Sequence, residues 1–166
     1  MLKLIMEKAK ESAQSGDAVA CAEPMAGATE QPSGSFVNAA SFGRHRFVID
    51  EPEDFGGTDT AANPAEIMLG AIGASIAVTL RGHAALMDIA VGKVRVELSG
   101  ALDTRGFFDV DPRIRAGFAD IDIRVCVETD AGPETLEKLN RQVLRSCPVL
   151  DACRNPTPVT MSFTTA

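Results

Sequence analysis

The sequence lacks tryptophan and tyrosine, and its two histidines, His45 and His83, stand far apart in the 166-residue chain. Its four cysteines form no CxxC pair and lie at no spacing typical of zinc ligands; they are Cys21, Cys126, Cys147 and Cys153. Because metal sites take clustered histidine, cysteine or carboxylate ligands, the sequence predicts no metal and no cofactor. A chain of this length needs no disulfide to hold its core, so we expect free thiols in a reducing compartment.

Basic residues are also scarce: the chain has 16 lysines and arginines but 23 acidic residues, so its formal net charge is −7. This balance disfavours a protein that coats nucleic acid, because phosphate binding requires a basic face. The longest apolar run, residues 67–80, is shorter than the roughly 18 residues expected of a membrane span. Charge returns soon after Met1, which is not typical of a signal peptide. We therefore expect a cytoplasmic protein that binds neither membrane nor nucleic acid.

The chain divides by composition into an N-terminal extension, residues 1–34, and one domain, residues 35–166. Leu2, Ile5 and Met6 share one side of an expected amphipathic helix over residues 1–15. Small and polar residues, with glycine and proline, then fill residues 15–34. That composition predicts a linker with little fixed structure.

The clearest local signal is Asn63-Pro64-Ala65-Glu66, which has the pattern of a capping box at the start of a helix. Asparagine is a good N-cap, and proline is well tolerated at the first helical position. The pattern predicts a helix from Pro64 to about Met87. No charge occurs between Glu66 and Arg81, so the helix is apolar on every side and is expected at the centre of the fold, surrounded by protein.

The remaining elements follow from alternating and helical apolar patterns. A β-hairpin is predicted from residues 35–40 and 44–49, with further strands over 91–98, 121–127 and 159–163. Helices are predicted over residues 133–145 and 148–153, on either side of the Cys147-Pro148 pair. This order indicates an α+β fold in which helices pack on an antiparallel sheet.

Cys147 is the thiol with the most suggestive local setting. If Pro148 opens a helical turn, Cys147 is its N-cap, and backbone N–H groups would point at the sulfur and favour the thiolate. The alternative is a buried cysteine that only fills space in the core, which is the common situation of free cysteine.

The other candidates also have structural explanations. Glu66 is explained locally by the capping box, and a lone serine in an apolar helix, such as Ser75, most often bonds a backbone carbonyl one turn earlier. Cys126 and Cys153 have no partner at a metal-type spacing and are read as structural. The two histidines are too isolated to suggest a catalytic set with a serine.

Three segments together resemble the OsmC/Ohr-like family, the proteins of osmotic induction and organic hydroperoxide resistance. They are Asp50-Glu51-Pro52 with Gly56-Gly57, Asn63-Pro64-Ala65-Glu66 with the helix up to Ser75, and Ser146-Cys147-Pro148-Val149 followed by Asn155-Pro156-Thr157-Pro158-Val159. The likeness covers roughly residues 36–163 and matches the predicted element order.

This resemblance implies an intertwined homodimer with a central helix in each subunit and two active sites at the subunit interface. Family members use a cysteine of the central helix to attack an organic hydroperoxide. The resulting sulfenic acid condenses with the cysteine of the Cys-Pro motif, and a dithiol reductant then reduces the disulfide.

Carried onto this chain, the resemblance assigns Cys147 as the second cysteine and Glu66 as the acidic site residue, with Arg44 or Arg46 as the basic one. Ser75 stands where the family has its first cysteine. A serine hydroxyl is far less acidic than a thiol and cannot close a disulfide.

Two hypotheses follow for the function. In the first, Cys147 is the only active-site thiol, assisted by Ser75 and resolved by Cys153, by a second subunit or by an external thiol. In the second, the protein is catalytically inactive and binds a small hydrophobic ligand in a pocket at the dimer interface.

Overall fold

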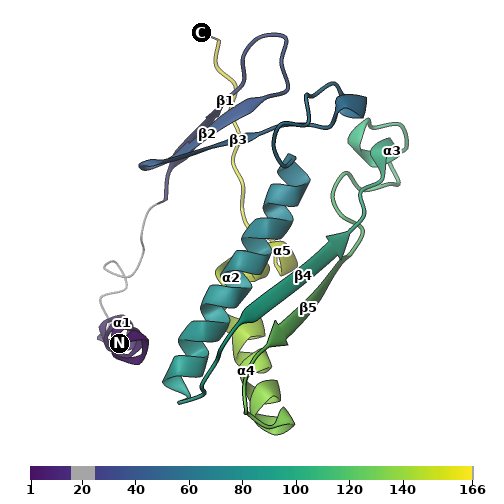
Figure 1. Cartoon of the computed structure of the whole chain (residues 1–166). Coiled ribbons are helices and arrows are strands. Elements are labelled where there is room, and N and C mark those ends of the chain that lie inside the picture. Colours follow the sequence, from purple (N-terminus) through teal and green to yellow (C-terminus); the bar gives the residue numbers. More distant parts are fainter. Residues whose placement is uncertain (16–24, 166) are drawn as a thin grey trace. The chain divides into compact units, whose positions relative to one another are not determined.

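A computed structural model of the chain describes residues 1–15 and 25–165, so that Cys21 and part of the expected linker lie outside the described residues. The predicted N-terminal helix is confirmed as α1, Leu2–Gln14, and it buries none of its side chains. The chain divides into two compact units, residues 1–71 with 98–122 and residues 72–97 with 123–166. Figure 1 labels the elements of both units.

The first unit contains a three-stranded antiparallel sheet in the order β1 (Gly27–Glu30), β2 (Asn38–Phe42), β3 (His45–Ile49). The predicted hairpin is confirmed: Asn38 pairs with Ile49, and the turn includes Gly43 at a φ of 56°. Strand β1 corrects the expectation of an unstructured linker over residues 15–34. Its composition is poor in strand formers, but its backbone pairs with β2.

The loop between β3 and the first long helix is organised by Asp50, which is fully buried. Its carboxylate accepts hydrogen bonds from the hydroxyl and backbone N–H groups of Thr58 and Thr60. These donors, the Thr58 hydroxyl foremost, hold the pKa of Asp50 well below its usual range. A short 3-10 turn, η1 (Glu53–Phe55), ends at Gly56 with φ 84°. A Cβ on Gly57 would collide with the Glu51 carbonyl oxygen, so this position requires glycine.

Helix α2 (Pro64–Leu86) confirms the predicted central helix almost to the residue. The capping box is formed in both directions, since Glu66 N–H donates to Asn63 Oδ1 and Asn63 N–H donates to Glu66 Oε2, each at 2.9 Å. By length and composition α2 could cross a membrane, a property that core helices share.

The expectation that α2 is enclosed on every side is wrong for the single chain. Ile72, Ile76 and Leu80 are buried, but the Val78 side chain is 72% exposed and Met68 is 41% exposed. One chain therefore covers only part of the helix surface. The uniformly apolar sequence of α2 thus leaves apolar side chains in contact with solvent.

Two further strands, β4 (Val94–Gly100) and β5 (Ile121–Val127), form a two-stranded sheet and run in opposite directions in Figure 1. The connection between them carries the short α3 (Thr104–Phe107). Helices α4 (Pro133–Ser146) and α5 (Pro148–Arg154) follow β5 and confirm the predicted pair on either side of Cys147. The core of the second unit includes six buried apolar residues: Ile72, Ile76, Leu80, Leu139, Val143 and Leu150.

The α+β class is confirmed, but the predicted closing strand over residues 159–163 is not formed. This segment has no regular structure, and Val159, Met161 and Phe163 are 85%, 76% and 89% exposed. A strand forms only when another strand supplies hydrogen-bonding partners, and this segment pairs with none in the described chain. Alternation of apolar and polar residues over 159–163 therefore does not make this segment a strand.

Candidate functional site

Ser75 and Cys147 lie together in the second unit, although 72 positions separate them in the sequence. The Ser75 Oγ atom is 3.2 Å from Cys147 Sγ, a hydrogen-bonding distance for sulfur. Ser75 comes from the middle of α2, and Cys147 comes from the junction between α4 and α5. The structure thus pairs the two residues that the family resemblance had assigned to the two cysteine positions.

The position of Cys147 follows from the proline after it. Pro148 disfavours helical geometry in its predecessor, and Cys147 has an extended backbone with φ −78° and ψ 110°. Cys147 is therefore both the C-cap of α4 and the N-cap of α5. Its N–H donates to the Val143 carbonyl, and its own carbonyl accepts from the Asp151 N–H.

The N-cap position of Cys147 is confirmed, but the expected bonds from backbone N–H groups to its sulfur are not. No N–H of α5 donates to the Cys147 side chain. The Cys147 side chain is fully buried and points toward α2, so its sulfur instead contacts the Ser75 hydroxyl. From the apolar helix alone, the Ser75 hydroxyl is expected to bond a carbonyl of its own helix. The contact with the sulfur is instead the arrangement that the first functional hypothesis needs, in which Ser75 assists Cys147.

An apolar cavity of about 370 Å³ lies in the same unit. Ile76, the neighbour of Ser75, lines it, and so do Val143 and Leu150, which precede and follow Cys147 by one helical turn. The remaining lining residues come from α2, β5 and α4, with Asn140 as the one polar residue: Leu80, Ile123, Val125, Val127, Leu136, Leu139, Asn140 and Leu144. The volume lies within the range of small-molecule sites.

The other predicted site residues belong to the first unit or to exposed positions. Glu66 closes the capping box of α2, so its carboxylate has a structural role. Arg44 lies in the turn before β3 and Arg46 on β3, and both are exposed. The participation of these three residues at the Ser75–Cys147 pair stays a prediction. Cys126 and Cys153 are exposed free thiols.

The Ser75–Cys147 pair has a definite chemical capacity. A hydroxyl donates a stronger hydrogen bond to an ionised acceptor than to a neutral one, so Ser75 is placed to stabilise a thiolate or an oxidised sulfur at Cys147. Only the thiolate is a good nucleophile, and only sulfur can be oxidised reversibly by a peroxide. Any covalent redox chemistry of the pair therefore belongs to Cys147.

The described chain thus combines an α+β fold of two small antiparallel sheets with a buried thiol, Cys147, that contacts helix α2 from the Cys147-Pro148 turn. The family model described as OsmC-like protein matches residues 57–162. The chain belongs to the OsmC-like protein family.

Three solved structures with a similar fold share little sequence with the chain. An OsmC-like protein from Mycoplasma pneumoniae aligns with a TM-score of 0.70 at 13% identity, covering 81% of this chain and 89% of that one. An organic hydroperoxide resistance protein from Elizabethkingia anophelis aligns with a TM-score of 0.61 at 15% identity, covering 81% and 91%. An organic hydroperoxide resistance protein OsmC from Legionella pneumophila gives a TM-score of 0.58 at 16% identity, covering 80% and 90%. No curated protein matches the chain.

Proposed function

We propose that this protein is a thiol-dependent organic hydroperoxide reductase in which Cys147 is the only active-site thiol and Ser75 replaces the first cysteine of the family. The observation that carries the proposal is the 3.2 Å approach of Ser75 Oγ to Cys147 Sγ. The names of the Elizabethkingia and Legionella proteins support the substrate class. The proposed location is the cytoplasm, where a thiol remains reduced.

The proposed reaction begins with the Cys147 thiolate, which attacks one oxygen of the hydroperoxide. The O–O bond breaks, and the second oxygen leaves with a proton as an alcohol, so that the sulfur becomes a sulfenic acid. Where no thiol of the protein has reached this sulfur first, an external dithiol attacks it and releases water. Its second thiol displaces Cys147 as the thiol, and the dithiol departs as a cyclic disulfide. The Ser75 hydroxyl donates to the sulfur or to the sulfenate oxygen throughout.

The proposal includes a homodimer, as the family resemblance implies. The sheet of the first unit buries only Ala40 among its apolar residues, while Phe42, Phe47 and Val48 are 48%, 40% and 48% exposed. A small sheet requires an apolar face packed against another element to be stable, so a covering surface is needed. The mass of the native protein in solution tests this part, and a monomer at micromolar concentration would contradict it.

The reaction itself is tested by the consumption of cumene hydroperoxide with dihydrolipoamide or dithiothreitol as the reductant. Wild type and Cys126→Ser are expected to consume the peroxide at the same rate, because Cys126 is an exposed thiol outside the pair. Cys147→Ser is expected to fall to the rate of the reductant alone. Equal rates for wild type and Cys147→Ser would contradict the proposal.

A second candidate function is the binding of a small hydrophobic ligand without catalysis. The observation that favours it is the 370 Å³ apolar cavity, whose lining includes Val143 and Leu150, one helical turn before and after Cys147. Native mass spectrometry of the freshly purified protein would show a bound ligand, and the Cys147→Ser variant would retain it. Saturable binding of an aliphatic ligand by the Cys147→Ser variant, with no peroxide consumption by wild type, would favour this function over the first.

A further inference from the structure

We infer that helix α5 is a redox-coupled gate, which must unwind for Cys153 to reach Cys147 and close a disulfide with it. The peroxide-driven form of this step rests on the proposed function, because the peroxide must first oxidise Cys147. The disulfide itself requires only that both thiols meet and that an oxidant accepts two electrons. The inference therefore makes Cys153 the resolving cysteine and α5 the element that controls its approach.

The folded helix keeps the two thiols apart. Cys147 is the N-cap of α5, and Cys153 follows six residues later within the same helix. At about 1.5 Å of rise per residue, their Cα atoms lie about 9 Å apart along the helix axis. A disulfide requires Cα atoms within about 7 Å of each other. The two cysteines therefore cannot bond while α5 is intact.

The two thiols also differ in access, since Cys147 is fully buried and Cys153 is exposed. A partner chain cannot increase the exposure of Cys147, so a reactant reaches the sulfur only when part of the surrounding protein moves. The α5 segment is suited to such movement because it is only seven residues long and buries only Leu150. The chain that follows it is exposed, so little packing opposes its unwinding. Unwinding frees Cys147 and Cys153 together.

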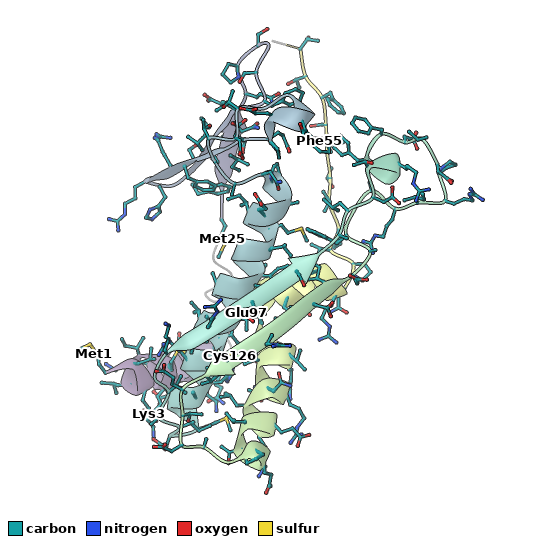
Figure 2. All side chains as sticks on the ribbon, turned by 45° about the vertical axis from the view of Figure 1, so that its right-hand side comes forward. Met1, Lys3, Met25, Phe55, Glu97 and Cys126 are labelled. Atoms are coloured by element: carbon teal, nitrogen blue, oxygen red, sulfur yellow. The ribbon has the colours of Figure 1, made fainter. Side chains whose placement is uncertain are left out.

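The third described cysteine is placed less favourably. Val125 and Val127 of β5 line the apolar cavity together with Val143 and Leu150, which flank Cys147. Successive side chains of a strand point to opposite faces, so Cys126, labelled on β5 in Figure 2, points away from that cavity. Within the described residues of one chain, Cys153 is therefore the thiol that a local movement brings to Cys147.

The hydroperoxide is the only oxidant that formation of this disulfide requires. The hydroperoxide converts the Cys147 thiol to a sulfenic acid and leaves as the alcohol. The Cys153 thiol then attacks the Cys147 sulfur, water leaves, and the new S–S bond closes a ring that spans α5. This ring is incompatible with the helical spacing of the two residues, so oxidation holds α5 unwound until a dithiol reduces the bond.

The sequence makes the disulfide easy to detect, because trypsin cleaves after Arg145 and Arg154 and releases both cysteines in the peptide Ser146–Arg154. A Cys21→Ser/Cys126→Ser variant removes the other thiols. After treatment with cumene hydroperoxide, the peptide is expected to be lighter by two hydrogen atoms and unable to take up iodoacetamide. Addition of Cys153→Ser is expected to leave a sulfenic acid at Cys147 that dimedone traps.

The role of α5 is tested by its helical stability. Ala152→Gly lies within α5 at an exposed position and is expected to raise the rate of ring closure about fivefold, because glycine weakens a helix relative to alanine. Ala9→Gly, at an exposed position of α1, is the matched control and is expected to leave the rate unchanged. Equal rates for Ala152→Gly and wild type would overturn the gating role.

Treatment with the thiol oxidant diamide separates this inference from the proposed function. Ring closure by hydroperoxide supports both. Ring closure by diamide but not by hydroperoxide supports the gate and contradicts the peroxidase. A dimedone adduct at Cys147 in the presence of Cys153, with no ring under either oxidant, supports the peroxidase and overturns the gate. Retention of both thiols under both oxidants overturns the two together.

Discussion

The capping box at the start of α2 gives a prediction whose magnitude follows directly from the structure. Glu66 was a candidate for the active site, but its carboxylate accepts the Asn63 N–H at 2.9 Å. Glu66→Gln keeps an acceptor oxygen at that position, whereas Glu66→Ala removes it. If the structural role dominates, the two variants differ in stability by roughly one backbone hydrogen bond, about 1 kcal/mol.

This difference is measurable in urea. For a chain of this size the free energy of unfolding falls by about 2 kcal/mol per molar urea, so the midpoint of Glu66→Ala is expected about 0.5 M below that of Glu66→Gln. Asn63→Ala removes the reciprocal bond and is expected to cost about 1 kcal/mol relative to wild type. The double variant Asn63→Ala/Glu66→Ala is expected to lose less than the sum of the single variants, because both act on one motif.

The same variants separate the cap from catalysis. Glu66→Gln removes the charge with little loss of the cap, so a structural Glu66 predicts unchanged hydroperoxide consumption in this variant. Equal urea midpoints for Glu66→Ala and Glu66→Gln would refute the reasoning about the cap. A large loss of activity in Glu66→Gln at unchanged stability would show instead that the carboxylate acts at the site, as the family resemblance implies.

Three further predictions concern other parts of the chain. Ser75→Cys is expected to raise hydroperoxide consumption by ~10-fold or more, because a thiol already in contact with Cys147 resolves the sulfenic acid without an external thiol and without unwinding of α5. It is also expected to cross-link the tryptic peptides 47–81 and 146–154, and the absence of both effects would contradict the pairing of Ser75 with Cys147. Because the pKa of Asp50 is lowered by folding, its carboxylate stabilises the fold fully above the unfolded pKa, near pH 4, and this stabilisation declines as the pH falls toward the folded pKa. Asp50→Asn is expected to flatten the decline in the free energy of unfolding, measured in urea between pH 7 and pH 3. The same pH dependence in wild type and Asp50→Asn would contradict the assignment. Leu139→Ala is expected to lower the free energy of unfolding by about 2–5 kcal/mol, since Leu139 is 2% exposed, and a loss below 1 kcal/mol in the same measurement would contradict its place in the core.

The longer helices α2 and α4, and the short α5 after Pro148, were predictable because their signals are local, whereas the four-residue α3 was not predicted. Asn63-Pro64 and Glu66 define the start of α2, and Pro148 separates α4 from α5, so the predicted bounds differ from the observed ones by a residue at most. A helix satisfies its backbone within its own segment, and its sequence therefore carries most of the information needed to place it.

Strands were less predictable because they depend on distant partners. Gly27–Glu30 looks like a linker but pairs with β2, whereas residues 159–163 alternate like a strand and pair with nothing in the described chain. The site shows the same limit. The Cys-Pro motif placed Cys147 at an N-cap, but the choice of Ser75 over the α5 N–H groups as the sulfur's partner depends on packing between segments 72 positions apart.

The central claim is that Cys147, beside Ser75, is the thiol that reacts with organic hydroperoxide. A single-turnover reaction without reductant tests it most directly, because the oxidation state of the peptide Ser146–Arg154 can then be followed by mass as one equivalent of cumene hydroperoxide is consumed. The account predicts that oxidation appears in this peptide at the rate of peroxide loss and that Cys147→Ser abolishes both. A peptide that stays fully reduced while wild type is exposed to excess peroxide would contradict it.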